Sequence, residues 1–296
     1  MNAVDLHTHS TCSDGTYTPE ELMDYAAEKE LKAIALTDHD TVAGIAPARR
    51  HIEEKRLPLE LIPGIELSTI YDLPDEEREQ EVHVVGLFVD TENRDFIDTI
   101  ENNARSRVGR NAEICEKLTA AGLPVTYEEL EEANPGAVLT RAHIAKLLLA
   151  KGLINTRQEA FDRYIGDDGP CFVPRKKVSP FEAVELILSA KGVPVLAHPM
   201  LYKLSRAQLT RLAKEMQDAG MIGIEAIYST YTQEEERTVR QIAKELSLLV
   251  SGGSDFHGAN KPGLDLRTGY GSLFVPETVL WELRGNIPSL SSKEPR

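Results

Sequence analysis

Cysteine is scarce in this chain, and the sequence has neither a long apolar run nor an excess of positive charge. Its three cysteines, Cys12, Cys115 and Cys171, form no paired motif, so we expect no disulfide framework and no Cys-x-x-Cys zinc site. Unpaired cysteines are typical of a reducing compartment, which predicts a cytoplasmic location. The sequence lacks a run of about 18 apolar residues for a membrane-spanning helix. The first residues also lack the basic and apolar regions of a signal peptide.

The acidic balance of the chain restricts its partners. A formal net charge of −15 argues against binding of long duplex nucleic acid through a basic face. It still allows a small anionic substrate, because bound divalent cations reverse the local sign of the field. We expect no membrane contact and infer no obligate protein partner.

The order of apolar and amphipathic segments predicts an α/β fold. With 41% hydrophobic and 27% charged residues, the composition is that of a soluble globular protein. Its 296 residues are enough for two domains or for one large α/β barrel. Short apolar runs alternate with helical segments, as in a parallel sheet or barrel. The predicted strands are residues 3–7, 32–37, 59–67, 82–89, 193–198, 222–228 and 248–255. The predicted helices between them are residues 18–30, 40–55, 179–192, 205–220 and 232–246.

This alternation is interrupted once. About 100 residues between the fourth and fifth strands read as helices without a convincing strand. We expect residues 95–178 to form an inserted helical subdomain, and residues 1–94 and 179–296 to form a discontinuous barrel domain. Such an insertion is expected over the carboxyl-terminal face of the barrel, where the βα loops lie.

Histidines and carboxylates gather at the predicted strands. His7 and His9 are two residues apart, so both rings point to the same face of an extended strand. The whole group is His7, His9, His39, His83, His198 and His257, with Asp14, Asp38, Asp40, Glu66 and Asp255. Strand ends converge at the mouth of a parallel barrel, so this pattern predicts a multinuclear metal centre. Taken singly, each position also has an ordinary structural explanation, and His51 receives no role.

The motifs that carry these residues resemble those of the PHP (polymerase and histidinol phosphatase) superfamily. They are DLHTHSTCSDG, ALTDHD, GIELS, VHVVG, LAHP and GSDFHG. The resemblance implies a distorted (β/α)7 barrel with two or three divalent metal ions at its mouth. The ligand set that it implies is His7, His9, Asp14, His39, Glu66, His83, His198, Asp255 and His257. Imidazole and carboxylate ligands without thiolate suit Mn²⁺, Fe²⁺ or Zn²⁺, and Mn²⁺ is our first expectation.

The resemblance also implies roles within this set. Glu66 would bridge metal ions, and a hydroxide shared by two ions would attack the phosphorus. Glu66, Asp255 and His257 are the catalytic candidates, with Asp255 orienting the hydroxide or relaying its proton. By family analogy His7, His9 and Asp255 would complete one metal site, Asp14, His39 and His257 a second, and His83 and His198 a third.

Substrate phosphate requires further cations. Arg141 and His143 lie in TRAHIA, which resembles a phosphate-binding motif, and arginine can meet a phosphate with two parallel hydrogen bonds. Arg175, Lys176 and Lys177 are further candidates, although a solvated loop explains them equally well. Tyr202 and Lys203 complete the candidate substrate-binding residues.

The segment SDGTYTPEEL, the helical insertion and TRAHIA resemble a bacterial branch of metal-dependent phosphoesterases in this superfamily. This resemblance implies a phosphoric ester hydrolase acting on terminal phosphates of nucleotides. The substrates would be nucleoside 3′,5′-bisphosphates, short 5′-phosphorylated oligoribonucleotides, or both. Histidinol-phosphate phosphatases are the alternative, but they commonly have histidine where Asp14 stands. A metal-dependent amidohydrolase is disfavoured because no strand-end lysine suggests a carbamylated bridge. A non-catalytic scaffold is disfavoured because the ligand set is complete.

Overall fold

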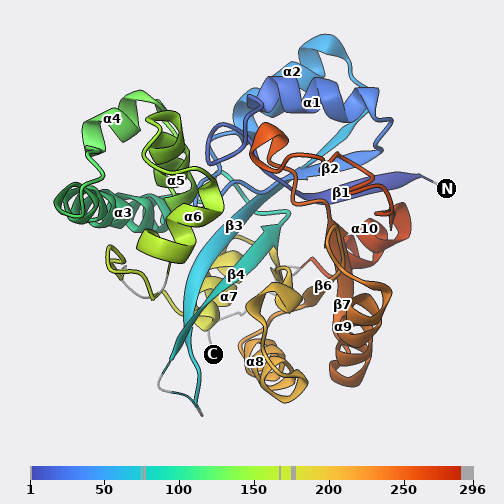
Figure 1. The fold of residues 1–296 in the computed structure, drawn as a ribbon. Coiled ribbons are helices and arrows are strands. Elements are labelled where there is room, and N and C mark those ends of the chain that lie inside the picture. Colours follow the sequence, from blue (N-terminus) through green and yellow to red (C-terminus); the bar gives the residue numbers. More distant parts are fainter. Residues whose placement is uncertain (1, 75, 77, 167, 175–177, 288–296) are drawn as a thin grey trace.

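The protein, described here from a computed structural model, is built around one strongly curved sheet. The structure describes residues 2–74, 76, 78–166, 168–174 and 178–287. Within these ranges eight strands pair in the order β7-β6-β5-β4-β3-β2-β1-β8 and nearly close into a barrel (Figure 1). The strands are β1 (Ala3–Thr8), β2 (Ala33–Leu36), β3 (Glu60–Asp72), β4 (Glu79–Leu87), β5 (Val193–Leu196), β6 (Gly223–Tyr228), β7 (Leu249–Gly253) and β8 (Val275–Pro276). The predicted distorted barrel is confirmed, and only the two-residue β8 was not anticipated.

Helices surround the sheet in the expected alternation. The helices are α1 (Pro19–Glu28), α2 (Ile45–Lys55), α3 (Arg94–Ala120), α4 (Tyr127–Glu132), α5 (Arg141–Ala150), α6 (Arg157–Ala160), α7 (Pro180–Ser189), α8 (Arg206–Asp218), α9 (Gln233–Leu246) and α10 (Glu277–Arg284). Short η1 (Phe161–Ile165), η2 (Pro199–Tyr202) and η3 (Gly258–Asn260) lie between them. In the described ranges no helix combines the length and the apolar character needed to cross a bilayer.

The ends of β1 and β7 meet where the barrel closes. The backbone N–H of Asp255 donates to the His7 carbonyl at 2.8 Å, and that of His9 donates to the Phe256 carbonyl at 2.9 Å. Gly253 permits this approach, because a Cβ atom there would lie 2.4 Å from the Cβ of His7. Strands β1 and β7 are therefore joined beside the two histidines of the HTH motif.

One strand does not run as the sequence analysis predicted. We expected parallel strands, but β4 is antiparallel to both β3 and β5. Only residues 73–78 separate β3 from β4, and a parallel pair needs a crossover of a dozen or more residues. The two strands therefore form a long hairpin, and His83 lies within β4, as it does in the predicted strand of residues 82–89.

The antiparallel course of β4 also changes where the helical insertion begins. Leu87, the last residue of β4, pairs with Val193, the first residue of β5. The chain therefore leaves β4 at the end of the barrel remote from the mouth, and not from a loop at the mouth as expected. The 27 residues of α3, about 40 Å of helix, then carry the insertion alongside the barrel to its mouth.

The inserted helices pack around apolar residues of their own. Ile114, Leu118, Leu130, Ile144 and Leu148 belong to one buried cluster from α3, α4 and α5. In Figure 1 these helices, in green, gather at one side of the barrel next to β3. The division into a barrel domain and a subdomain of residues 95–178 agrees with this packing and stays a prediction.

Candidate active site

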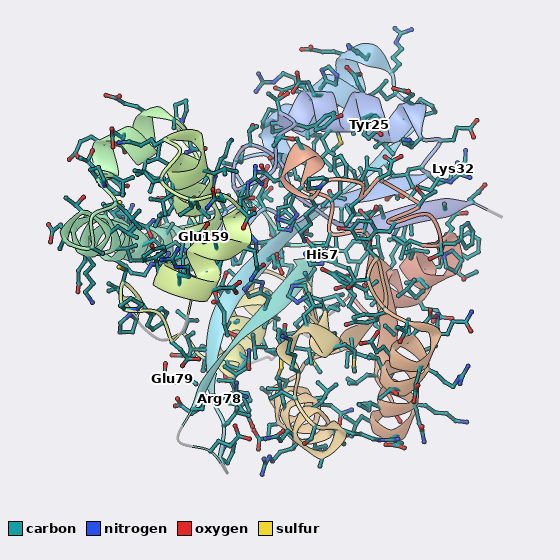
Figure 2. All side chains as sticks on the ribbon, viewed as in Figure 1. His7, Tyr25, Lys32, Arg78, Glu79 and Glu159 are labelled. Carbon is teal, nitrogen blue, oxygen red and sulfur yellow. The ribbon has the colours of Figure 1, made fainter. Side chains whose placement is uncertain are left out.

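The nine residues of the predicted ligand set converge at one end of the barrel. They come from β1 and the loop after it, from the loops after β2, β5 and β7, and from within β3 and β4. Seven are buried, whereas His39 and His83 are half-buried. Figure 2 shows His7 at the centre of the molecule, among side chains from several strands. The sets whose ligand atoms lie within 4.8 Å of one another are His9, Asp14, His39 and His257; His7, His9 and Glu66; His7, His198 and Asp255; and His39, Glu66 and His83.

Glu66 lies at the centre of this cluster. Its Oε2 atom is 3.2 Å from Nε2 of His7, 3.2 Å from Nε2 of His9 and 3.1 Å from Nδ1 of His39. Its Oε1 atom is 2.8 Å from Nδ1 of His83 and 2.9 Å from Nε2 of His198. One carboxylate therefore contacts five imidazoles, three through one oxygen and two through the other. This is the geometry expected of a carboxylate that could bridge metal ions.

Asp14 and Asp255 are the other two carboxylates of the cluster. Oδ1 of Asp14 is 3.1 Å from Nε2 of His257 and 3.8 Å from Nε2 of His39. Oδ1 of Asp255 is 3.3 Å from Nε2 of His9. The grouping of Asp14, His39 and His257 agrees with the family analogy. His83 and His198, grouped together by that analogy, fall in different sets of neighbours, although both contact Oε1 of Glu66.

Several ligand atoms in the cluster are buried without a hydrogen-bond partner among the described residues. Buried polar atoms are rarely left in this state, because the loss of hydration costs about 1–3 kcal/mol each. The atoms are Nε2 of His7, Nε2 of His9, Oδ1 of Asp14, Nδ1 of His39, Oε2 of Glu66 and Nδ1 of His198. Metal ions among them would complete their coordination, so these residues fit a metal centre. Nitrogen and oxygen donors without thiolate suit Mn²⁺, Fe²⁺ or Zn²⁺.

The charges in the cluster shift its pKa values strongly. Burial alone would raise the pKa of Glu66, but the imidazoles of His39, His7 and His83 hold it well below its usual range. Burial opposes protonation of His9, yet Asp255 and Glu66 raise its pKa to about 9. Glu66 and Glu81 likewise raise the pKa of His83 to about 9 against burial. The carboxylates thus favour positive charge at the places where metal ions would bind.

Residues outside the predicted set hold the imidazoles in position. Oε1 of Glu225 on β6 is 3.1 Å from Nδ1 of His7, and Oε2 accepts a 2.8 Å hydrogen bond from the backbone of His198. The sequence analysis missed Glu225, although an acidic residue inside the apolar run IGIEAIY was a usable signal. Such partners of the far ring nitrogen set the tautomer and orientation of metal-binding histidines.

Two carboxylates at the predicted strand ends, which the implied ligand set does not include, have other partners. Oδ1 of Asp38 accepts hydrogen bonds from the backbone of Ser10 at 2.7 Å and from the Ser13 hydroxyl at 2.6 Å. Asp38 therefore stabilises the loop that carries Asp14. Asp40 forms a buried ion pair with Arg107 of α3. Neither belongs to a metal-binding set within the described ranges.

Asp255 is held by two side chains that the sequence analysis did not consider. The Tyr228 hydroxyl donates to Oδ2 of Asp255 at 2.6 Å, and the Lys261 ammonium contacts the same oxygen. Oδ1 remains directed at the histidines. The two oxygens of one carboxylate thus have separate tasks, one anchored by the fold and one facing the cluster.

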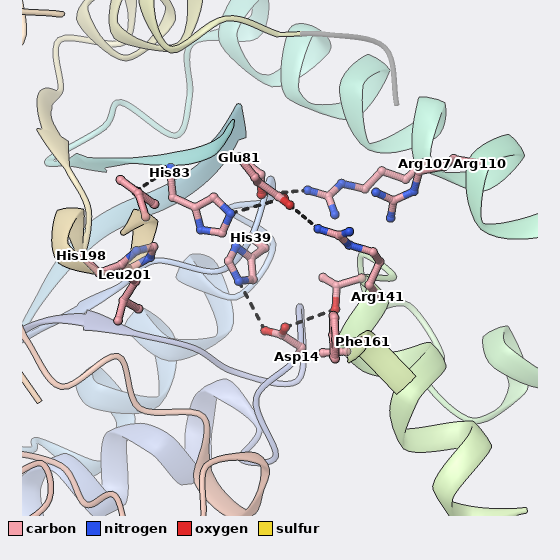
Figure 3. Close-up of a pocket in the computed structure, with 14 residues that line it drawn as sticks. Asp14, His39, Glu81, His83, Arg107, Arg110, Arg141, Phe161, His198 and Leu201 are labelled. Carbon is pink, nitrogen blue, oxygen red and sulfur yellow. Dashed lines mark hydrogen bonds and ion pairs between the residues drawn. The ribbon is translucent and has the colours of Figure 1, made fainter. Parts of the chain in front are cut away.

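A cavity of about 270 Å³ opens beside the cluster. Asp14, His39, His83 and His198 lie on one side of it, and Arg107, Arg110 and Arg141 line the other (Figure 3). Arg141 donates to the Ile165 carbonyl at 3.1 Å and pairs with Glu81 of β4. Arg110, which the sequence analysis missed, donates to Oδ1 of Asn111 at 2.8 Å. Cations from the insertion thus face the cluster of histidines and carboxylates across one small cavity.

The other predicted substrate-binding residues lie in different surroundings. Tyr202 lines the cavity, but its hydroxyl joins the Ala197 carbonyl to the His83 backbone at 2.6 and 2.9 Å. His143 is buried, and its Nδ1 accepts the Thr140 N–H at 2.9 Å at the start of α5. Lys203 is exposed after η2. Arg175, Lys176 and Lys177 lie outside the described residues.

Comparison with known proteins assigns the chain to a family. The PHP domain matches residues 5–165, which is more than half of the sequence. The chain belongs to the PHP domain family. Its matched region contains six residues of the cluster, namely His7, His9, Asp14, His39, Glu66 and His83.

Three proteins illustrate what this PHP chain is similar to. It is 36% identical over 254 residues to the 5′-3′ exoribonuclease Rnm of Salmonella typhimurium, covering 86% of this chain and 84% of that protein. It is 30% identical over 267 residues to the 3′,5′-nucleoside bisphosphate phosphatase of Chromobacterium violaceum, covering 90% and 91%. The solved structure of an amidohydrolase from Chromobacterium violaceum, with bound sulfate, superposes with a TM-score of 0.83. That structure is 29% identical and covers 96% of both chains.

Proposed function

We propose that this protein is a metal-dependent phosphoesterase that hydrolyses a terminal phosphate ester of nucleotides carrying a second phosphate. One observation carries the proposal: the His/Asp/Glu cluster and the arginines of the insertion face each other across one cavity of about 270 Å³. A reacting phosphate would lie at the cluster, and the other phosphate would contact Arg141 and Arg110. Arginine suits this task because it offers paired donors to phosphate oxygens.

The cluster residues would hold two or three divalent ions, with Glu66 between them. Such ions lower the pKa of a bound water and neutralise phosphate oxygens. Asp255 would orient the attacking water or take its proton; Tyr228 and Lys261 contact its Oδ2 while Oδ1 faces the cluster, which supports this role. His257, 3.1 Å from Asp14, would serve the same ion as that carboxylate.

The names of the relatives support a shared substrate geometry. A nucleoside 3′,5′-bisphosphate and a 5′-phosphorylated oligoribonucleotide both carry a phosphate on each side of one ribose. An exoribonuclease and a bisphosphate phosphatase are both similar to this chain. A cluster that cleaves at the 3′ side while arginines hold the 5′-phosphate would accept either substrate.

A substrate panel with Mn²⁺ tests the proposal. Adenosine 3′,5′-bisphosphate and a short 5′-phosphorylated RNA should be hydrolysed, with much lower kcat/KM for adenosine 5′-monophosphate and for p-nitrophenyl phosphate. Equal rates on adenosine 5′-monophosphate would contradict a second phosphate site. Faster hydrolysis of histidinol phosphate, or of an amide substrate, would support the corresponding alternative. A metal content below one ion per chain, in protein purified without chelators, would support a scaffold.

A further inference from the structure

A second cavity adjoins the one at the cluster and shares residues with it. It has a volume of about 460 Å³, within the range of small-molecule sites. Glu81, Arg110 and Arg141 line both cavities. Its other walls come from the β3–β4 hairpin and from the chain that returns from the insertion. Figure 2 places Arg78 and Glu79 toward the tip of that hairpin. Any group in this cavity would therefore lie beside a phosphate held by Arg141.

The lining of the second cavity does not suit another phosphate. Acidic and basic side chains line it in equal number. The acidic residues are Glu79, Glu81 and Asp168, and the basic residues are Arg78, Arg110 and Arg141. The remaining lining residues are apolar: Ile70, Phe172, Val173 and Pro174. An apolar wall with a mixed polar rim fits a neutral, flat group that has hydrogen-bonding edges. A nucleobase has these properties.

Phe172 offers a surface on which such a group can stack. The guanidinium carbon of Arg141 lies 5.6 Å from the centre of the Phe172 ring, a cation–π contact. The ring is only half-buried, so part of it faces the cavity. The Lys117 ammonium donates to the Phe172 carbonyl at 3.1 Å. Phe172 thus contacts α3 through its backbone carbonyl and Arg141 through one face of its ring.

The returning chain that carries Phe172 is also attached to the barrel. The backbone N–H of Ile70 on β3 donates to the Val178 carbonyl at 2.9 Å. Cys171, next to Phe172, donates its N–H to the Tyr164 carbonyl at 2.9 Å and is buried in the core of the inserted helices. These contacts keep the second cavity beside the hairpin.

We propose that the second cavity is a nucleobase subsite in which Phe172 stacks on the base of the nucleotide whose phosphate contacts Arg141. This inference rests on the proposed function and adds how the substrate is recognised: the nucleotide is bound through its base as well as through its phosphates. Stacking on an aromatic ring accepts every base, because each has a π-face. The site therefore contributes affinity without selecting a sequence.

A comparison of kcat/KM for substrates with and without a nucleobase tests the inference. The probes are adenosine 3′,5′-bisphosphate and 1-deoxyribose 3,5-bisphosphate, which carries the same phosphates without a base. With Mn²⁺ the wild-type kcat/KM should be about 10-fold or more higher for the adenosine compound. Phe172→Leu, which keeps an apolar side chain but removes the ring, should reduce this ratio to within about twofold. Phe172→Trp should retain the ratio, and Phe274→Leu, at an exposed ring that lines neither cavity, should leave it unchanged.

Binding to the metal-free protein separates this inference from the proposed function. In a chelating buffer, calorimetry should show adenosine 5′-monophosphate binding about 10-fold more tightly than ribose 5-phosphate, with the difference lost in Phe172→Leu. Failure of the wild type to hydrolyse either bisphosphate would overturn the proposed function but leave this binding result to decide the subsite. Equal binding of the two monophosphates, or equal losses on both bisphosphates in Phe172→Leu, would overturn the subsite.

Discussion

Glu225 contacts His7 through the ring nitrogen that faces away from Glu66: its Oε1 lies 3.1 Å from Nδ1, whereas Nε2 is 3.2 Å from Glu66. Both carboxylates are buried. One imidazole is thus fixed between a carboxylate inside the cluster and one outside it. This arrangement makes the outer residue a positioning residue whose effect can be measured.

Glu225→Ala should weaken metal binding about 10- to 100-fold, because it removes the partner that sets the tautomer and orientation of His7. Titration of the metal-free protein with Mn²⁺ measures the affinity, and thermal melting in chelator shows whether the fold is retained. Glu225→Gln keeps an acceptor for His7 and should lose less. Equal affinities in the wild type and a well-folded Glu225→Ala protein would contradict the prediction.

The stability of the metal-free protein should fall as the pH rises from about 7 to about 10. The pKa values of His9 and His83 are raised to about 9 in the folded protein, above the usual value for histidine. Their protonation therefore stabilises the fold fully below about pH 6.5, and this contribution is lost as the pH passes about 9. The pKa values of Asp14 and Glu66 are lowered in the folded protein. Their contribution to stability is therefore lost only in acid, and it stays constant between pH 7 and about 10.

Metal binding should remove this dependence, because metal ions replace the protons on the two rings. Scanning calorimetry across this pH range, in chelator and with saturating Mn²⁺, compares the two states. The apparent affinity for Mn²⁺ should rise over the same interval. A melting temperature in chelator that rises steadily from pH 7 to about 9.5 would show that the two imidazoles are not held protonated.

Arg141→Gln should lower kcat/KM for adenosine 3′,5′-bisphosphate roughly 10- to 100-fold. Loss of a charge-assisted hydrogen bond costs about 1.5–3 kcal/mol, and each 1.4 kcal/mol is a factor of ten. Activity on p-nitrophenyl phosphate, which has no second phosphate, should change less than about twofold. Steady-state kinetics on both substrates gives the comparison. Arg163→Gln is the control, because Arg163 is exposed and pairs with Glu159.

Arg107→Met should destabilise the fold by about 3–5 kcal/mol, since it leaves Asp40 buried without its ionic partner. The side chains of Arg107 and Asp40 are 7% and 6% exposed, and Arg107 also donates to Ser68 at 3.0 Å. Urea unfolding measures the free energy. The double variant with Asp40→Asn should recover part of the loss. Arg105→Met, at an exposed position of the same helix, should cost under about 0.5 kcal/mol.

The sequence by itself determined the chemistry of the centre. Residue types alone identify imidazole and carboxylate donors, and a local period of two places His7 and His9 on one face. Apolar runs bounded by turns predicted seven of the eight strands found in the described ranges. These features depend on neighbours within a few residues, which a single sequence displays directly. The helical character of the segment between β4 and β5 was readable for the same reason.

Only the tertiary structure decided the direction of β4, the route of α3 to the mouth, and the partners outside the cluster. Glu225 contacts His7 across 218 positions of sequence, and Arg107 meets Asp40 across 67. The face of Phe172 near Arg141 likewise depends on how the returning chain folds against the insertion. Such contacts arise from packing between distant segments, and residue spacing carries no record of which segments become neighbours.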